Sequence, residues 1–239
     1  MSVVVHLFAL LTAALEPLLA DSATAAAIVV ATLLVRTLLH PLARAGVRAE
    51  KARAALAPRI AELRKRHAGD PERLRRAVLD LHAKEGISPL AGLLPMLAQL
   101  PVFFVMYRLF SAPRVGGEAN GLLDHRLGAA PLGGHWADAL GDGGVFGAQG
   151  LVYLGLFAVI AAVASWTYRR ARAAARTAPP EMAGPARMLP LLSFGTLVTA
   201  AFVPLAAGLH LATTTAWTAV ERALLHRDRG SAGRTGGGR

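Results

Sequence analysis

Long apolar stretches recur along the chain and alternate with polar segments. Most of them hold about 20 residues, and a helix of that length crosses a hydrocarbon layer about 30 Å thick. The fourth stretch is shorter and ends just before Pro204, which predicts local thinning of the membrane or a break in the helix. The pattern predicts an all-α polytopic membrane protein with five transmembrane helices, at about residues 23–42, 87–110, 148–168, 188–203 and 205–225.

The first 21 residues are also apolar, but Glu16 and Pro17 interrupt them. A cleaved signal peptide is one interpretation, although no Lys or Arg precedes the apolar run as a signal peptide requires. We prefer an N-terminal interfacial helix over residues 1–21, lying on the membrane before a five-span core of residues 22–225. The Gly- and Arg-rich residues 226–239 are expected to form a disordered basic tail.

Residues 43–86, between the first and second spans, are too many for a simple connection and are patterned as helices. Asp70 and Pro71 predict a helix start, because aspartate caps free backbone N–H groups and proline fits the first helical turn. Gly86 is expected to end this helix, and Pro58 to restart the helix before it. The segment is therefore predicted to be a helical hairpin with its tip at residues 68–70, although most of its charges also fit a solvated connector.

Composition narrows the classes of function. Charged residues make up 17% of the chain and hydrophobic residues 54%, whereas soluble domains carry about 25% charged residues. The absence of cysteine excludes disulfides, thiol catalysis and cysteine-ligated metal. The eight histidines do not fall at metal-ligand spacings, and the sequence has no nucleotide-binding or hydrolase motif. We therefore expect no metal, no cofactor and no enzymatic activity.

The net charge of +11 is distributed unevenly. Residues 43–86, 169–187 and 226–239 carry an excess of Lys and Arg, whereas the loop at 111–147 carries an excess of acids. With five spans all basic segments fall on one side of the membrane. The positive-inside rule identifies that side as the cytoplasmic side. The N-terminus and the 111–147 loop are then extracytoplasmic, and the hairpin, the 169–187 loop and the C-terminus are cytoplasmic. Basic charge spread over several membrane-proximal segments favours anionic lipids over nucleic acid as a partner.

Polar residues form stripes on two of the predicted spans. Thr32, Arg36 and His40 share one side of the first span, although a charge at the centre of a span costs about 2.5–3.5 kcal/mol on insertion scales. Polar stripes on spans usually face a bundle interior or a wet cavity, which predicts a polar chamber within the membrane. The alternatives are snorkelling of Arg36 to the interface and helix–helix contacts by the threonines. The fifth-span stripe and the second span contribute His210, Thr213, Thr214, Trp217, Glu221 and Gln99.

The second span carries the most specific motif of the chain. It reads EGISPLAG at residues 85–92 and QLPVFF at residues 99–104. This pattern closely resembles the signature of the YidC family of membrane protein insertases. Arg36 followed by Pro41 is similar to the end of that family's first core span. The resemblance extends over about residues 5–225.

The resemblance implies an insertase and folding chaperone in the bacterial plasma membrane. In that family a client's polar segment enters a positively charged groove, open to the cytoplasm, and the client's apolar helix then passes into lipid. The expected partners are newly made membrane proteins, together with the ribosome and the SecYEG channel. Arg36 matches the groove arginine, and we expect the rest of the groove to be lined by Thr32, Gln99, His210, Thr214 and Trp217. The client is expected to be contacted on the lipid side by Phe103, Phe104 and Met106.

The last span departs from the family pattern. His210 and Leu211 stand where the family has an aromatic pair, and Glu221 stands where it has a glutamine. Two other classes of protein stay open, a non-inserting assembly partner and a small transporter. Binding of membrane subunits without insertion would identify the first, and ion flux in liposomes the second.

The predicted topology can be tested without background labelling because the chain has no cysteine. We expect Ala68→Cys, at the hairpin tip, to react with a membrane-impermeant maleimide only after the cells are opened. Gly141→Cys, in the 111–147 loop, should react in intact cells. The reverse pattern would invert the topology, and labelling of both sites in intact cells would refute the five-span arrangement.

Overall fold

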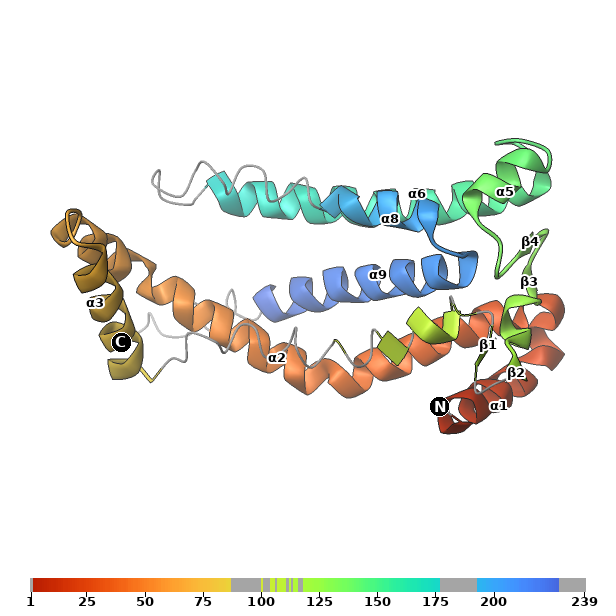
Figure 1. Cartoon of the computed structure of the whole chain (residues 1–239), viewed down its shortest axis with the longest axis horizontal. Helices are drawn as coiled ribbons and strands as arrows, with labels where there is room; N and C mark the ends of the chain where they lie inside the picture. The colour runs from red at the N-terminus through yellow and green to blue at the C-terminus, as the bar shows by residue number, and fades with distance from the viewer. Residues whose placement is uncertain are drawn as a thin grey trace, which may run out of the picture. The chain divides into compact units, whose positions relative to one another are not determined.

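The computed structural model describes residues 2–86, 100, 104–105, 107–110, 112, 114–115, 118–176 and 193–227. Over these residues the chain is mostly helical, which confirms the predicted α-helical character of the fold (Figure 1). The helices are α1 (Ser2–Leu19), α2 (Ala23–Arg66), α3 (Pro71–Lys84), α5 (Trp136–Gly141), α6 (Ala148–Arg176), α8 (Gly195–Phe202) and α9 (Leu205–Arg227), with short 3-10 turns η1 (Ala20–Ser22) and η2 (Gly121–Leu123).

Two helices of the described residues, α2 and α6, are long and apolar enough to cross a membrane. In α6 this stretch is Ala148–Ala173. The α9 helix has 23 residues but carries more polar groups. Most of the second predicted span and the first part of the fourth lie outside the described residues, so the count of five stays a prediction.

The chain divides into two compact units. The first holds residues 1–37 and 104–224, and the second holds residues 38–103 and 225–239. The boundary falls inside α2, so that the first part of this helix belongs to one unit and its remainder to the other.

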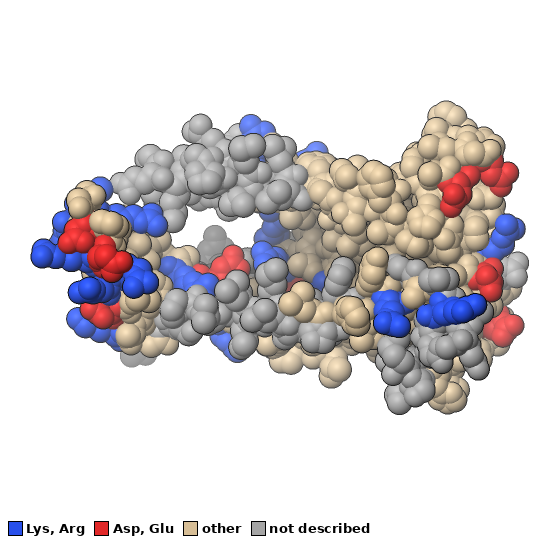
Figure 2. Space-filling view, in the orientation of Figure 1, with Lys and Arg blue, Asp and Glu red and all other residues tan. Residues whose placement is uncertain are grey.

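In the second unit, α2 and α3 form two helices joined by a short turn after Arg66. The backbone N–H of Arg73 donates to the Asp70 side chain at 3.0 Å, so the start predicted at Asp70 and Pro71 is confirmed. Gly86 follows the end of α3 with φ +64°, a conformation that glycine adopts without strain. An ion pair between Arg59 and Glu85 joins the two helices. Basic and acidic side chains cover this pair of helices (Figure 2).

The expectation that Pro58 restarts the helix is wrong. The α2 helix runs through both Pro41 and Pro58 without interruption. Proline removes one backbone hydrogen bond from a helix, but alanine, leucine and arginine, which surround Pro58, are among the strongest helix formers. Their combined preference keeps the helix continuous.

The first unit is packed through small side chains. Half of the buried hydrophobic residues of the described chain are alanines, among them Ala27, Ala31, Ala164 and Ala206. A Cβ atom at Gly208 of α9 would lie 2.8 Å from Cδ2 of Leu156 in α6, so glycine permits the close approach of these helices. Small residues between helices and large apolar residues on the outside, such as the exposed Val198 and Phe202, are typical of membrane bundles.

Three helices of the first unit run in the same direction. Figure 1 shows that the start of α2, α6 and α9 share one orientation and that α8 runs the opposite way. The backbone turns at Val203, which is extended, so that α8 and α9 are connected by a tight turn at Pro204. The break predicted at Pro204 is therefore confirmed.

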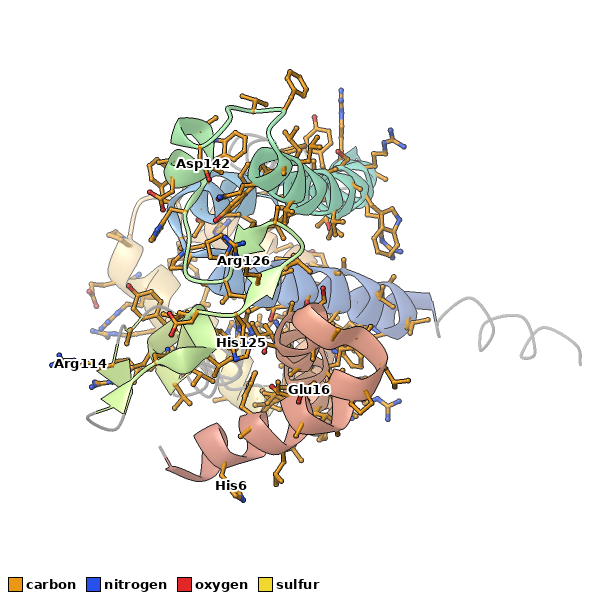
Figure 3. All side chains as sticks on the ribbon, turned by 90° about the vertical axis from the view of Figure 1, so that its right-hand side faces the viewer. His6, Glu16, Arg114, His125, Arg126 and Asp142 are labelled. Carbon is orange, nitrogen blue, oxygen red and sulfur yellow. The ribbon has the colours of Figure 1, made fainter. Side chains whose placement is uncertain are left out.

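The loop between the second and third predicted spans has regular structure that the sequence analysis did not predict. Two antiparallel ladders, β1 (Arg114–Val115) with β2 (Glu118–Ala119) and β3 (Arg126–Leu127) with β4 (Ala130–Pro131), precede α5. Figure 3 looks onto this end of the unit, where Arg126 and Asp142 are labelled on the loop.

Hydrogen bonds attach this loop to α6, to the start of α9 and to Leu109, near the end of the second predicted span. The Asn120 side chain is buried and donates to the carbonyl oxygen of Leu109 at 2.7 Å, near the end of the second predicted span. The first N–H groups of α9, on Leu205 and Ala206, donate to the carbonyls of Gly134 and Leu132 at 2.9 and 2.8 Å. The Tyr153 hydroxyl of α6 also donates to Gly134. The loop thus satisfies donors that a helix start leaves unpaired and fixes the helix ends around it.

Candidate functional site

The site is built between α2 and α9, where polar side chains of the two helices meet inside the first unit. Thr32 is 1% exposed, and its Oγ1 lies 2.9 Å from Nδ1 of His210. One turn further along both helices, the guanidinium of Arg36 donates to the carbonyl oxygen of Thr214 at 3.4 Å. The second contact lies four residues after the first in both helices, so α2 and α9 run parallel to each other.

The hydrogen bonds of Thr32 determine which nitrogen of His210 carries a proton. The Thr32 hydroxyl also lies 2.7 Å from the carbonyl oxygen of Ile28 in its own helix. A hydroxyl has one hydrogen and a carbonyl can only accept, so both contacts are hydrogen bonds only when His210 Nδ1 donates. The neutral ring then presents Nε2 as an acceptor.

Arg36 is only partly compensated. The carboxyl group of Glu221, two turns beyond Thr214, interacts electrostatically with Arg36 and is 7% exposed. The Arg36 Nε atom is buried and has no hydrogen-bond partner among the described residues. A partly buried guanidinium whose contact to a carbonyl is long keeps donors that a further acceptor can occupy.

Aromatic rings cover the histidine end of this arrangement. The Phe110 ring centroid lies 5.6 Å from that of His210, and Phe8 packs edge-on against Phe110 at the same distance. Both phenylalanines are almost completely buried. The Thr32–His210 hydrogen bond therefore lies in apolar surroundings, where hydrogen bonds are electrostatically stronger than in water.

An apolar cavity of about 590 Å³ lies between α2, α6 and α9. Its walls include Leu33, Leu156 and Trp217. The Trp217 Nε1 atom is buried without a hydrogen-bond partner among the described residues. Trp217 thus belongs to an apolar wall rather than to the polar contacts of Thr32 and Arg36.

A second cavity of about 230 Å³ has a different lining and was missed by the sequence analysis. It lies between α6, α8 and α9, and its polar wall is formed by Thr167, Ser193, Thr196, Thr215, Thr218 and Arg222. The α9 residues of this wall lie at i, i+3 and i+7, a spacing that the sequence analysis applied only to the neighbouring stripe. Hydroxyl residues scattered over three helices form no sequence motif, so only the packing identifies them as a set.

The structure brings together four of the predicted site residues, Thr32 with His210 and Arg36 with Thr214. Phe104 is 62% exposed, and its role as a client contact stays a prediction. His40 belongs to the second unit. The predicted residues Gln99, Phe103 and Met106 lie outside the described residues. In the described part of the chain no group of His, Asp and Glu is arranged to hold a metal ion.

Membrane-length helices, small-residue packing and polar groups between helices define a helical membrane protein with an internal polar site. Comparison with known families agrees with this class. The chain belongs to the family described as 60Kd inner membrane protein, which matches residues 16–231. The predicted relationship to the YidC family is confirmed by many similar proteins named Membrane protein insertase YidC.

The similarity to these relatives is concentrated in one part of the chain. The protein of Helicobacter pylori is 39% identical over 83 residues, which are 35% of this chain and 15% of that protein. The Campylobacter jejuni protein is 40% identical over 83 residues, 35% of this chain and 16% of that protein. The Pseudomonas entomophila protein is 40% identical over 80 residues, 34% and 14% of the two chains. The matched region thus covers about a seventh of each relative.

The Thr32–His210 contact predicts an energetic coupling between α2 and α9. We expect Thr32→Val and His210→Phe to be coupled by about 0.5–1.5 kcal/mol in a double-mutant cycle, because each removes one partner of the same hydrogen bond. Reversible unfolding in mixed micelles measures this coupling. Thr37→Val is the matched control, since the Thr37 hydroxyl is exposed and donates to the carbonyl oxygen of Leu33 in its own helix. A coupling for Thr32 no larger than that for Thr37 would show that the contact does not hold the helices together.

Proposed function

We propose that the protein is a membrane protein insertase that receives polar, acidic segments of client membrane proteins beside Arg36. The relatives that share its best-matched region are named as insertases, and the chain belongs to their family. The observation that carries the proposal is the arginine itself, a partly compensated charge within a membrane-length apolar helix. An ionisable residue within a membrane-spanning segment is costly and by default indicates a functional site.

The chemistry of Arg36 suits a carboxylate. Guanidinium donors form a planar fork that matches the two oxygens of a carboxylate. In a medium of low polarity this attraction is much stronger than in water, so one arginine lowers the cost of moving an acidic segment into the membrane. The Arg36 guanidinium donates to Thr214 only through a long hydrogen bond. An acidic client group would accept hydrogen bonds from the same N–H groups.

Glu221 provides Arg36 with a counter-charge from the protein itself. An uncompensated buried arginine is destabilising, whereas a nearby carboxylate offsets part of this cost. When an acidic client segment arrives, it competes with Glu221 for the same guanidinium. Binding is therefore expected to be transient, and the client is released as its apolar segment partitions into lipid. No nucleotide or covalent step is needed.

The direction of the helices supports the five-span topology. If the start of α2, α6 and α9 each cross the membrane in one direction, the chain must return across it between them. The second predicted span and the segment that ends in α8 would supply these two returns. In the proposed orientation the N-terminus is extracytoplasmic, and the basic α2–α3 hairpin faces the cytoplasm, where it would first meet a client or the ribosome.

The direct test is insertion in liposomes that contain only this protein. A client with one or two spans and an acidic N-terminal segment is synthesised in their presence, and protection from added protease is scored. We expect protection with the wild type and with Arg36→Lys, which keeps the charge, and a loss of at least about tenfold with Arg36→Ala.

The matched control is Arg126→Ala, which removes one exposed arginine from the loop at the far end of the unit and should leave insertion unchanged. Equal protection with wild type and Arg36→Ala would contradict the role of the arginine. Binding of clients without any protection, by protein that unfolds at the wild-type temperature, would favour the assembly-partner alternative.

A further inference from the structure

A third cavity, of about 420 Å³, lies at one end of α6 and has no part in the proposed insertase site. It is formed by one face of the helix together with the residue that precedes α8. Among the described residues its lining includes Ser165, Tyr168, Arg169, Arg172, Ala173 and Phe194. Four of these residues recur at i, i+3, i+4 and i+7, which places them on one side of the helix.

The position of this cavity along α6 is fixed by the length of the helix. The 21 residues from Ala148 to Tyr168 contain no charge, and at 1.5 Å per residue they extend about 30 Å. That length equals the thickness of the hydrocarbon layer, so Tyr168 reaches its boundary and Arg169 is the first charge beyond it. The cavity therefore lies at the level of the lipid head groups.

The side chains of the cavity are arranged by contacts among themselves. The Arg172 guanidinium lies 6.0 Å from the centroid of the Tyr168 ring and donates to the Tyr168 hydroxyl oxygen at 3.4 Å. The Tyr168 ring also packs against Phe194, with centroids 5.9 Å apart. Because the hydroxyl oxygen accepts from arginine, its own hydrogen is available to a second acceptor.

We propose that the cavity formed by Tyr168, Arg169, Arg172 and Phe194 binds the phosphate of an anionic phospholipid. Two arginines and one tyrosine line the same space, and its other described lining residues are Ser165, Ala173 and Phe194. Arginine forks match phosphate oxygens, and basic pockets beside membrane helices are suited to anionic head groups. The apolar wall of Phe194 and Ala173 favours a lipid over free phosphate, because the glycerol and the first acyl carbons can lie against it.

The neighbouring Arg170 allows a matched comparison. It lies in the same helical turn but stacks over the Trp166 ring, with its guanidinium carbon 5.5 Å from the ring centroid. Arg170 and Arg172 contribute equally to the general positive field of this end of the helix. Of Arg170 and Arg172, it is Arg172 that lines the cavity and contacts Tyr168.

The experiment measures retention of phosphatidylglycerol by the full-length protein in detergent, using native mass spectrometry at about 0.3 M salt to screen the general field. We expect Arg172→Gln to weaken retention at least about tenfold more than Arg170→Gln. Tyr168→Phe, which leaves every charge in place, should weaken it about threefold to tenfold, the value of one hydrogen bond. Phosphatidylcholine should be retained poorly by all four proteins.

Three outcomes would overturn the proposal. Equal losses with Arg170→Gln and Arg172→Gln would mean that only the general field attracts the lipid. Full retention by Tyr168→Phe would exclude the hydroxyl from the site. Displacement of the lipid by an equal concentration of inorganic phosphate would identify a site for free phosphate instead. Thermal unfolding of each variant verifies that the protein compared is folded.

Discussion

A positive charge within an apolar, membrane-length helix has to be compensated by groups of the protein or by water, and in this chain the charge is Arg36. Leaving it in hydrocarbon would cost about 2.5–3.5 kcal/mol on insertion scales, a large fraction of the stability of a typical domain. The described structure compensates it from α9, through the carbonyl of Thr214 and the carboxyl group of Glu221. This requirement ties α2 to α9, and the Thr32–His210 contact one turn away ties them again.

Compensation from α9 in turn depends on how the end of that helix is held. The loop carbonyls of Leu132 and Gly134 accept from the first N–H groups of α9, and Tyr153 of α6 donates to Gly134 as well. The loop also holds the end of the second predicted span through Asn120. Hydrogen bonds to the loop therefore hold these helix ends together. Gly208 permits the close approach of α9 to α6. The polar contacts of Arg36 lie further along α2 and α9, beyond this closed end.

Much of this arrangement follows from the sequence, and the rest depends on packing. The period of the polar stripes identified Thr32, Arg36, His210 and Thr214, because residues four apart share a helix face. The helix start at Asp70 also depends only on residues close in the sequence, and the structure confirms it. Continuity of α2 through Pro58 was not foreseen, since the surrounding helix formers outweigh one proline. The two short ladders of the loop and the hydroxyl-lined cavity depend on contacts between distant segments, which no spacing in the sequence records.

Photo-crosslinking tests our proposal that acidic client segments bind beside Arg36. A photoreactive phenylalanine analogue at position 217, three residues after Thr214 in α9, would be combined with an insertion client whose N-terminal acids are intact or changed to amides. We expect several-fold more crosslinking of the acidic client than of the amide client. This preference should be lost when Arg36 is replaced by alanine. Equal crosslinking of both clients in the wild-type protein would contradict it.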